Sequence, residues 1–239
     1  MTLLSNIYLS GLSLGNSECQ IICDALVDHP YLQVLVISKN RFTGVTAGNA
    51  ISSLIKRKFP KEQSSTATLK LLDISSNSLG NNGGQPIFNA LLCDHSQIET
   101  LNIANCDIEM LLNSEFESEN EHEVTRVHKL VLDDNPLKTW AVTRFSNLVA
   151  MSIYLKDVSF KNCGLSDEGA RSLFDSACRG RRMNRINFSQ NHITDVGVES
   201  IANVIDYHAR INHKTHIEYL SLAGNMITGK GVKALLNVL

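Results

Sequence analysis

The sequence predicts an α/β solenoid in which about eight short parallel strands alternate with helices along its 239 residues. Three observations predict this fold class. One pattern of apolar and polar positions, seen in IEYLSLAGNMIT at residues 217–228, recurs throughout the chain. Its basic spacing is 28 or 29 residues. Each copy begins with the period of two that is typical of a strand and continues with the spacing of three and four that is typical of a helix.

The pattern has five positions: three apolar residues in the strand, then Asn or Cys, then a final apolar residue. Eight segments follow it, the first with Leu12 in place of Asn or Cys: Leu4/Ile7/Leu9/Leu12/Leu14, Leu32/Leu35/Ile37/Asn40/Phe42, Leu69/Leu72/Ile74/Asn77/Leu79, Ile98/Leu101/Ile103/Cys106/Ile108, Val127/Leu130/Leu132/Asn135/Leu137, Leu155/Val158/Phe160/Cys163/Leu165, Met183/Ile186/Phe188/Asn191/Ile193 and Ile217/Leu220/Leu222/Asn225/Ile227. The fourth position, called the amide position below, recurs after 28, 37, 29, 29, 28, 28 and 34 residues. Two insertions therefore lengthen an otherwise regular array.

Helical spacing follows the strands. Ser166 is a candidate N-cap for the helix of the sixth copy. The apolar residues expected on helix faces are Cys19 and Cys23 in the first copy, Ala170, Leu173, Phe174 and Ala177 in the sixth, Val198, Ile201, Ala202 and Ile205 in the seventh, and Val232, Leu235, Leu236 and Leu239 in the last. One strand and one helix cannot bury their own apolar faces, so neighbouring copies are expected to stack.

The amide position predicts an internal column of hydrogen-bonding side chains. The turn after each strand carries backbone groups into the stack, where water cannot reach them. A buried backbone group without a partner costs about 1–3 kcal/mol, so one amide in each coil is stabilising. Cys106 and Cys163 are expected to substitute through their thiols, which makes them structural. Leu12 lacks such a group, as is typical of a terminal repeat.

These motifs resemble the leucine-rich repeat family over the whole chain. The long period, with LSDEGARSLF and ITDVGVESIA after the strand, is similar to the ribonuclease-inhibitor-like class. The resemblance implies a horseshoe arc with a parallel sheet on the concave face and helices on the convex face. We expect residues 1–239 to form a single domain of a longer protein, with additional repeats or capping segments at both ends, because neither end shows a polar cap.

Composition narrows the function classes. A net charge of −2 disfavours nucleic acid as a partner, since phosphate-binding surfaces need a basic excess. The six cysteines are scattered, which favours a reducing compartment and a cytoplasmic location. No uninterrupted apolar run is long enough for membrane insertion, and the N-terminus lacks a basic lead and a cleavage site.

Four segments depart from the regular repeat. Lys56, Arg57, Lys58 and Lys61 in the insertion at 55–70 predict a solvated loop, or alternatively a patch for an acidic partner. His208, His213 and His216 in the insertion at 205–219 match no zinc motif. Alternating glutamates at 115–123 make no apolar face and predict an irregular loop, or alternatively an acidic docking strip. CRGRRMNR at 178–185 is a basic helix end and only a weak targeting signal.

No catalytic, cofactor-binding or metal-binding motif stands out, so we expect a protein that is not an enzyme and has no cofactor. The glycine-rich segment at 80–85 is predicted to be a turn after the third strand, since it lacks the lysine of a phosphate-binding loop. Eight repeats occupy nearly the whole chain and leave no room for a catalytic domain.

Side chains that alternate outward from the strands form the candidate binding surface, because successive residues of a strand face opposite sides. Tyr8, Val34, Val36 and Leu71 are expected to form an exposed apolar patch at the N-terminal end, and the later copies are charged. The hypothetical partner-binding residues are Tyr8, Val34, Val36, Leu71, Asp73, Lys129, Asp157, Lys161, Arg185 and Tyr219. Cover by another segment of the same protein is the alternative explanation of the apolar patch.

Three functions remain open. The first is a non-enzymatic scaffold for protein partners, as in the ribonuclease inhibitors, sensor receptors, cytoskeletal regulators and ciliary scaffolds that the repeat class resembles. The second is the recognition domain of a larger enzyme or effector. The third is a GTPase-activating regulator similar to that of Ran, for which Arg41 is the nearest basic residue in an early loop.

Overall fold

The computed structural model describes residues 3–56, 69–91, 96–110, 126–180, 182–211 and 215–239. They form two compact units, Met1–Val131 and Leu132–Leu239. The predicted alternation of eight parallel strands with helices is confirmed. That residues 1–239 form a single domain stays a prediction.

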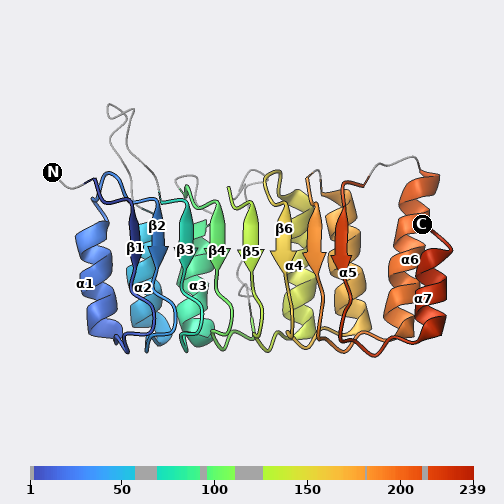
Figure 1. The fold of residues 1–239 in the computed structure, drawn as a ribbon, viewed down its shortest axis with the longest axis horizontal. Helices are drawn as coiled ribbons and strands as arrows, with labels where there is room; N and C mark the ends of the chain where they lie inside the picture. The colour runs from blue at the N-terminus through green and yellow to red at the C-terminus, as the bar shows by residue number, and fades with distance from the viewer. Residues whose placement is uncertain (1–2, 57–68, 92–95, 111–125, 181, 212–214) are drawn as a thin grey trace. The chain divides into compact units, whose positions relative to one another are not determined.

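The described residues of the first unit form five three-residue strands and three helices, which can be followed along the chain in Figure 1. Its elements are β1 (Asn6–Tyr8), α1 (Asn16–Leu26), β2 (Val34–Val36), α2 (Gly44–Ile55), β3 (Leu71–Asp73), α3 (Gly80–Leu91), β4 (Thr100–Asn102) and β5 (Lys129–Val131). The strands are parallel, follow chain order and pair in one constant register, so equivalent residues of successive copies lie side by side.

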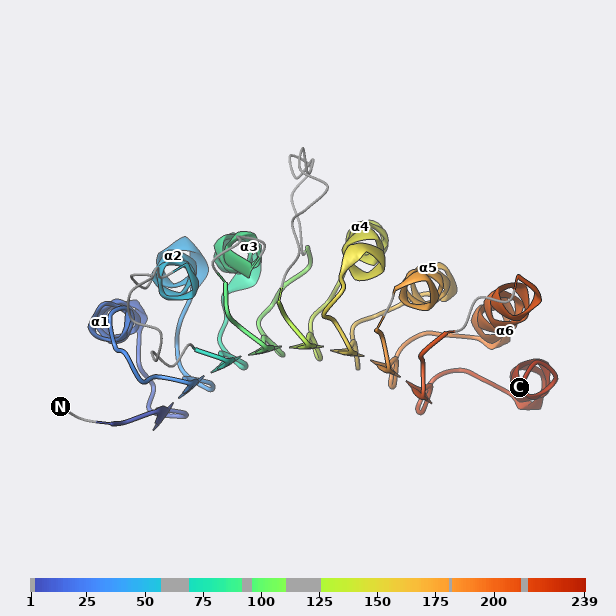
Figure 2. The ribbon, with the colours of Figure 1, turned by 90° about the horizontal axis from the view of Figure 1, so that it is seen from above.

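The second unit follows the same plan. Its elements are α4 (Thr139–Met151), β6 (Asp157–Ser159), α5 (Asp167–Arg179), β7 (Arg185–Asn187), α6 (Asp195–Arg210), β8 (Tyr219–Ser221) and α7 (Gly229–Leu236). In each unit the described helices lie on one side of that unit's strands (Figure 2). The opposite side of each sheet is called the helix-free face below.

The middle residue of most strands points into the core, as the period of two predicts. Leu35, Leu72 and Leu101 have no exposed surface in the first unit, and Ile186 is 1% exposed in the second. The residues on either side of each middle residue point to the helix-free face. The core therefore constrains the middle residue of each strand, while the two outward residues are free to vary in chemistry.

The predicted column of amides is present in the first unit. The Asn77 side chain is 1% exposed, and its Nδ2 donates to the carbonyls of Ile37 and Ile74 at 3.2 and 2.8 Å. Its Oδ1 accepts the backbone N–H of Phe42. Asn40 does the same for the first copy, since its Oδ1 accepts the N–H groups of Leu12 and Leu14 at 3.1 Å. The backbone of Leu12 thus donates to the amide of the next copy, although its own side chain has no polar group to continue the column.

The column is also present in the second unit. Asn191 Nδ2 donates to the Phe160 and Phe188 carbonyls at 2.8 and 2.9 Å, and its Oδ1 accepts the N–H groups of Cys163 and Leu165 at 2.9 Å. Asn225 has matching bonds to the copy before it. Asn191 and Asn225 thus each connect two copies, and Asn191 does so through buried backbone groups.

Two thiols occupy amide positions, as predicted. Cys106 Sγ donates to the carbonyl of Ile74 at 3.4 Å, and Cys163 Sγ donates to that of Leu132 at 3.2 Å. Burial raises the pKa of both thiols to about 12, so they stay protonated at neutral pH. A protonated thiol can donate its hydrogen to the backbone carbonyl, as the amide N–H does in the other copies.

The Asp of the DxG segments connects neighbouring copies. Asp167 accepts from the backbone and the hydroxyl of Thr194, both at 2.7 Å, and Thr194 is the N-cap of α6. Asp195 does the same for Thr228 and also accepts from the N–H of Gly231 at 3.0 Å. The Thr228 hydroxyl lowers the pKa of Asp195 below its ordinary range. The motif therefore links copies as well as beginning a helix.

The prediction of a turn at 80–85 is wrong, because these residues form the start of α3. Glycine has a low helix propensity, but here the missing side chains permit close packing. A Cβ on Gly48 of α2 would lie 2.3 Å from the carbonyl oxygen of Gly83. The contact between α2 and α3 therefore overrides local propensity.

The other helix predictions are largely confirmed. Ser166 caps α5 by accepting from the N–H of Gly169 at 3.3 Å. Cys19 and Cys23 are buried in α1. Ile205 was expected in the core of α6, yet it is only half-buried, while Val204 is 8% exposed. Small shifts of this kind arise because a helix buries a face wider than one line of residues.

Candidate interaction surface

The helix-free face of the first unit consists of two rows of outward side chains. The rows run across the strands in register and match the predicted positions: Asn6, Val34, Leu71, Thr100 and Lys129 in one, Tyr8, Val36, Asp73, Asn102 and Val131 in the other. Every one of these residues is half-buried or exposed. The repeat period was therefore sufficient to identify the face.

Four apolar residues gather on strands β1 to β3 and form the N-terminal apolar patch: Tyr8, Val34, Val36 and Leu71. Tyr8 is 65% exposed and pairs in register with Val36, and Val34 pairs with Leu71. The three aliphatic residues are half-buried. Since paired residues of adjacent strands lie within contact distance, these side chains make one continuous surface.

Asp73 borders this patch, but its carboxylate is already engaged. Its Oδ1 accepts from the backbone and hydroxyl of Ser75 at 3.0 and 2.7 Å, and its Oδ2 accepts from Asn102 Nδ2 at 3.0 Å. A partner that used Asp73 would compete with these bonds. The apolar neighbours are thus better candidates for the contact.

The helix-free face of the second unit is polar. Asp157, Arg185 and Tyr219 form one row, and Ser159, Asn187 and Ser221 form the next. Asn187 Nδ2 donates to Ser159 Oγ at 2.9 Å, while Asn187 Oδ1 accepts from the backbone and the hydroxyl of Ser189. The hydroxyls of Ser189 and Ser221 are 2.8 Å apart. This second row is a hydrogen-bonded network of short side chains.

Arg185 and Tyr219 are in contact on this face. The Arg185 Cζ lies 4.3 Å from the centroid of the Tyr219 ring, a cation–π distance. The sequence placed both residues on the face without linking them, because they are 34 positions apart. The register makes them neighbours, since Arg185 pairs with Tyr219 across β7 and β8.

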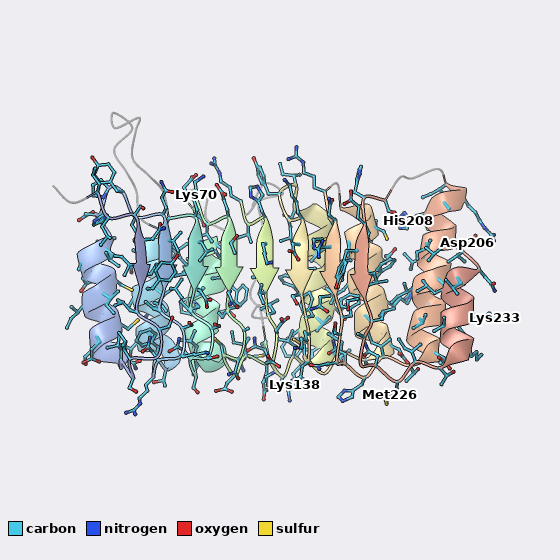
Figure 3. All side chains as sticks on the ribbon, viewed as in Figure 1. Lys70, Lys138, Asp206, His208, Met226 and Lys233 are labelled. Carbon is cyan, nitrogen blue, oxygen red and sulfur yellow. The ribbon has the colours of Figure 1, made fainter. Side chains whose placement is uncertain are left out.

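The two predicted lysines lie on different units. Lys129 is exposed on β5 in the first unit. Lys161 is half-buried just after β6 in the second, where its backbone N–H donates to Asp133 Oδ1 at 2.9 Å. The edge of the first unit where strands begin carries Lys70, which pairs with Glu99 at 3.1 Å (Figure 3). These charged groups flank the outward rows.

Several exposed apolar residues on the helix side were not singled out from the sequence. Val45, Trp140, Val196 and Tyr207 are between 48% and 61% exposed. They come from three helices, α2, α4 and α6, with Val196 and Tyr207 on different turns of the last. Single exposed apolar residues are common on protein surfaces and mark no site by themselves.

The apolar side expected on the last helix is exposed. Val232 and Leu236 are 49% and 65% exposed. Val198 and Ala202 occupy the same positions one copy earlier and are 1% and 3% exposed, because α7 packs against α6. The difference shows how much of a repeat's burial its following neighbour supplies.

The candidate metal ligands do not come together in the described part of the chain. His208 is 3% exposed, with its Nε2 3.5 Å from Asp175 Oδ1, whereas His216 is exposed (Figure 3). Within the described ranges, no group of three or more His, Cys, Asp and Glu residues could hold a metal ion.

Several sequence hypotheses fall outside the described residues: those on Arg57, Lys58, Lys61 and His213, and the glutamates at 115–123. Arg181, within the basic segment at 178–185, also lies outside them. Of the helices that the structure does describe, none is long and apolar enough to cross a lipid bilayer.

A family model described as "Leucine Rich repeat" matches residues 67–88, 152–174, 183–202 and 213–236. These matches include β3 with most of α3 and, in the second unit, β6, β7 and β8, each with all or part of the helix that follows it. The chain is a leucine-rich repeat protein. A helix follows every described strand except β4, after which residues 111–125 lie outside the described ranges. The repeats are of the ribonuclease-inhibitor-like type.

Three solved structures are similar to this leucine-rich repeat chain at low identity. Leiomodin-1 Actin-Binding Site 2 is 14% identical over 46% of this chain and 62% of its own, with a TM-score of 0.41. An internalin from Listeria monocytogenes is 12% identical over 88% and 67%, with a TM-score of 0.36. The mouse RP105/MD-1 complex is 17% identical over 100% and 41%, with a TM-score of 0.44. The chain thus spans less than two thirds of the first and third.

No curated protein matches the sequence. Leucine-rich repeat domains are typically protein-interaction modules and are usually non-catalytic. Domains of this family generally bind proteins.

Proposed function

We propose that this protein is a non-enzymatic scaffold that binds a protein partner through the N-terminal apolar patch. The supporting observation is the in-register cluster of Tyr8, Val34, Val36 and Leu71 on a face that no described helix covers. Clustered apolar side chains on an exposed face mark contact sites more often than scattered ones do.

Tyr8 is the anchor of the proposed contact. Its ring is 65% exposed, so binding would remove a large apolar area from water. Tyrosine is also enriched among the residues that dominate binding energy at interfaces. Val34, Val36 and Leu71 would form the surface around the ring.

The test is quantitative affinity capture with the wild-type chain and a Tyr8→Ala, Val36→Asp, Leu71→Asp variant. A Val45→Asp, Val196→Asp variant is the matched control, because both valines are exposed on helices away from the face. Specific partners should be lost with the patch variant and kept with the control. Unchanged capture by a folded patch variant would contradict the proposal.

We further propose that the protein acts in the cytoplasm. Cys106 and Cys163 support this location, because each donates a thiol hydrogen inside the amide column and must be reduced to do so. Reducing compartments keep thiols in that form. Imaging of the tagged full-length protein would test the location, and a signal confined to the secretory pathway would contradict it.

A further inference from the structure

The helix-free face of the second unit presents an arginine fixed against an aromatic ring. Arg185 is exposed, and its guanidinium carbon lies 4.3 Å from the centre of the Tyr219 ring, which is itself 43% exposed. A cation–π contact restrains a long side chain that would otherwise sample many rotamers. The guanidinium is therefore held at the surface before any ligand arrives.

The ring contact leaves the hydrogen-bonding capacity of Arg185 available. A guanidinium carries five N–H donors in its plane, whereas stacking uses its face. In the described part of the chain, no hydrogen bond or ion pair engages this guanidinium. Two parallel N–H groups match the two oxygens of a carboxylate, and such bidentate pairs are among the stronger polar contacts.

The charge around the pair favours an anionic segment. On this face and along its edges, the described cations are Lys156, Lys161, Arg182 and Arg185, and the described anions are Asp133 beside Lys161, Asp157 and Glu218. The local excess of one positive charge is opposite in sign to the chain's net charge of −2. Such an excess attracts acidic segments to this face.

A carboxylate fits this surface better than a phosphate group does. Phosphate groups on proteins are usually bound by clusters of arginines. Here one arginine stands on the face, and its register neighbour Asp157 would repel a group with about two negative charges. A single carboxylate meets less repulsion and still fills the guanidinium fork.

The neighbouring row gives a partner backbone room to approach. Ser159, Asn187 and Ser221 lie two residues further along the strands, about 7 Å from the row of Arg185. Their side chains are short and already ordered by the hydrogen bonds among them and Ser189. Binding there would order few additional side chains, which lowers its entropic cost.

We propose that the helix-free face of the second unit binds an acidic protein segment, with Arg185 holding an Asp or Glu carboxylate and Tyr219 positioning the guanidinium. This proposal rests on the proposed protein-binding function and assigns it a second contact of different chemistry. The N-terminal apolar patch would bury apolar area on binding, and the Arg185–Tyr219 pair would favour partners that carry a negatively charged side chain.

The test begins with selection of displayed random peptides on the immobilised full chain. The selected peptides are then synthesised with a fluorophore and titrated with wild type, Arg185→Gln, Arg185→Lys and Arg171→Gln. Arg171 is the matched control, because it is an exposed arginine on α5. Circular dichroism confirms that each variant is folded.

Acidic residues should be enriched among the selected peptides. Arg185→Gln should weaken their binding about tenfold or more, the usual contribution of a charged hydrogen-bonded pair. Arg185→Lys should weaken it nearly as much, since a lysine is a point charge without a fork. Arg171→Gln should bind as wild type does.

Three results would overturn the proposal: no Arg185-dependent peptide, peptides without Asp or Glu, or equal affinity for wild type and Arg185→Gln. Tighter binding of a matched phosphoserine peptide would overturn the choice of a carboxylate.

The variant Leu71→Asp distinguishes the proposal for the N-terminal apolar patch from the proposal for Arg185. Peptides lost with Leu71→Asp but kept with Arg185→Gln leave the N-terminal apolar patch standing, and the reverse pattern leaves only the Arg185 site.

Discussion

The helix-free faces of the two units share one backbone and differ in chemistry. The first unit presents Tyr8 with three aliphatic residues, and the second presents Arg185 against Tyr219 beside a hydrogen-bonded row. Their interiors are alike, since Asn77 and Asn191 make the same kinds of bonds in the same positions. The difference lies in the two outward positions of each strand, which the fold does not determine.

Recognition and folding are therefore assigned to alternate residues of the same short strand. The middle residue and the amide position fix the coil, and the residues on either side of the middle one are available for partners. Substitutions one position apart should then have very different consequences. That expectation provides the following tests.

The largest contrast is expected between Leu72 and Leu71. Leu72 has no exposed surface, so Leu72→Asp would bury a charge and should cost more than about 4 kcal/mol. Leu71 points outward and is half-buried, so Leu71→Asp should cost about 1 kcal/mol or less. Urea denaturation measures the stability lost in each variant. Similar losses would contradict the assignment of Leu72 to the core and Leu71 to the surface.

The amide column should give the next largest effect, and it should be similar in both units. Asn191→Ala removes two donated and two accepted hydrogen bonds and leaves buried backbone groups unsatisfied, a loss of about 3 kcal/mol or more. Asn77→Ala should resemble it. Asn187→Ala on the helix-free face is the control, and its cost should be smaller because its neighbours can reach water.

The thiols at the amide position predict a loss of stability at alkaline pH. Burial raises the pKa of Cys163 from its ordinary 9.0 to about 12, so the folded state keeps a proton that the unfolded state releases. Stability is full below pH 9 and falls as the pH rises toward 12, by about 1.4 kcal/mol for each thiol at pH 10.

The double variant Cys106→Ser, Cys163→Ser checks this assignment. Serine keeps a donor and does not ionise in this range. Denaturation at pH 8 and pH 10 should show a smaller alkaline loss for the variant than for wild type. An identical loss would mean that other groups are responsible.

Loss of the hydrogen bonds between Asp167 and Thr194, which connect neighbouring copies, should lower the free energy of unfolding least. Asp167→Ala removes two bonds to Thr194 and should cost about 1 kcal/mol, as the loss of a helix cap does. Gly197→Ala places a Cβ 2.3 Å from Asp167 Oδ1, so it should disturb the same contact. In a double-mutant cycle, the stability lost in the double variant should be smaller than the sum of the two single losses. Full additivity would mean that Asp167 and Gly197 do not act through the same contact.

The sequence predicted the strands, the outward rows and the amide column because each depends on one repeated spacing. It failed where tertiary packing overrides a local preference. Residues 80–85 contain three glycines and suggested a turn, yet Gly83 enters α3 because its backbone approaches that of Gly48. No local signal reports that approach.

The sequence also could not show which outward residues are already engaged. Asp73 is a predicted partner contact, and its carboxylate accepts hydrogen bonds from Ser75 and Asn102. Alignment of the copies by their period places Asp73 beside Asn102 and Arg185 beside Tyr219. Side-chain geometry was needed to show that both pairs are in contact.

The most direct test of the account is the unfolding free energy of one variant, Tyr8→Thr, Val34→Thr, Val36→Thr, Leu71→Thr. Threonine suits a strand, so the substitutions remove apolar surface without disfavouring the backbone. If these four residues serve recognition, the variant should stay within about 1.5 kcal/mol of wild type. A loss above about 4 kcal/mol, as large as that from a charge buried at Leu72, would show that the patch holds the fold together and would contradict the account.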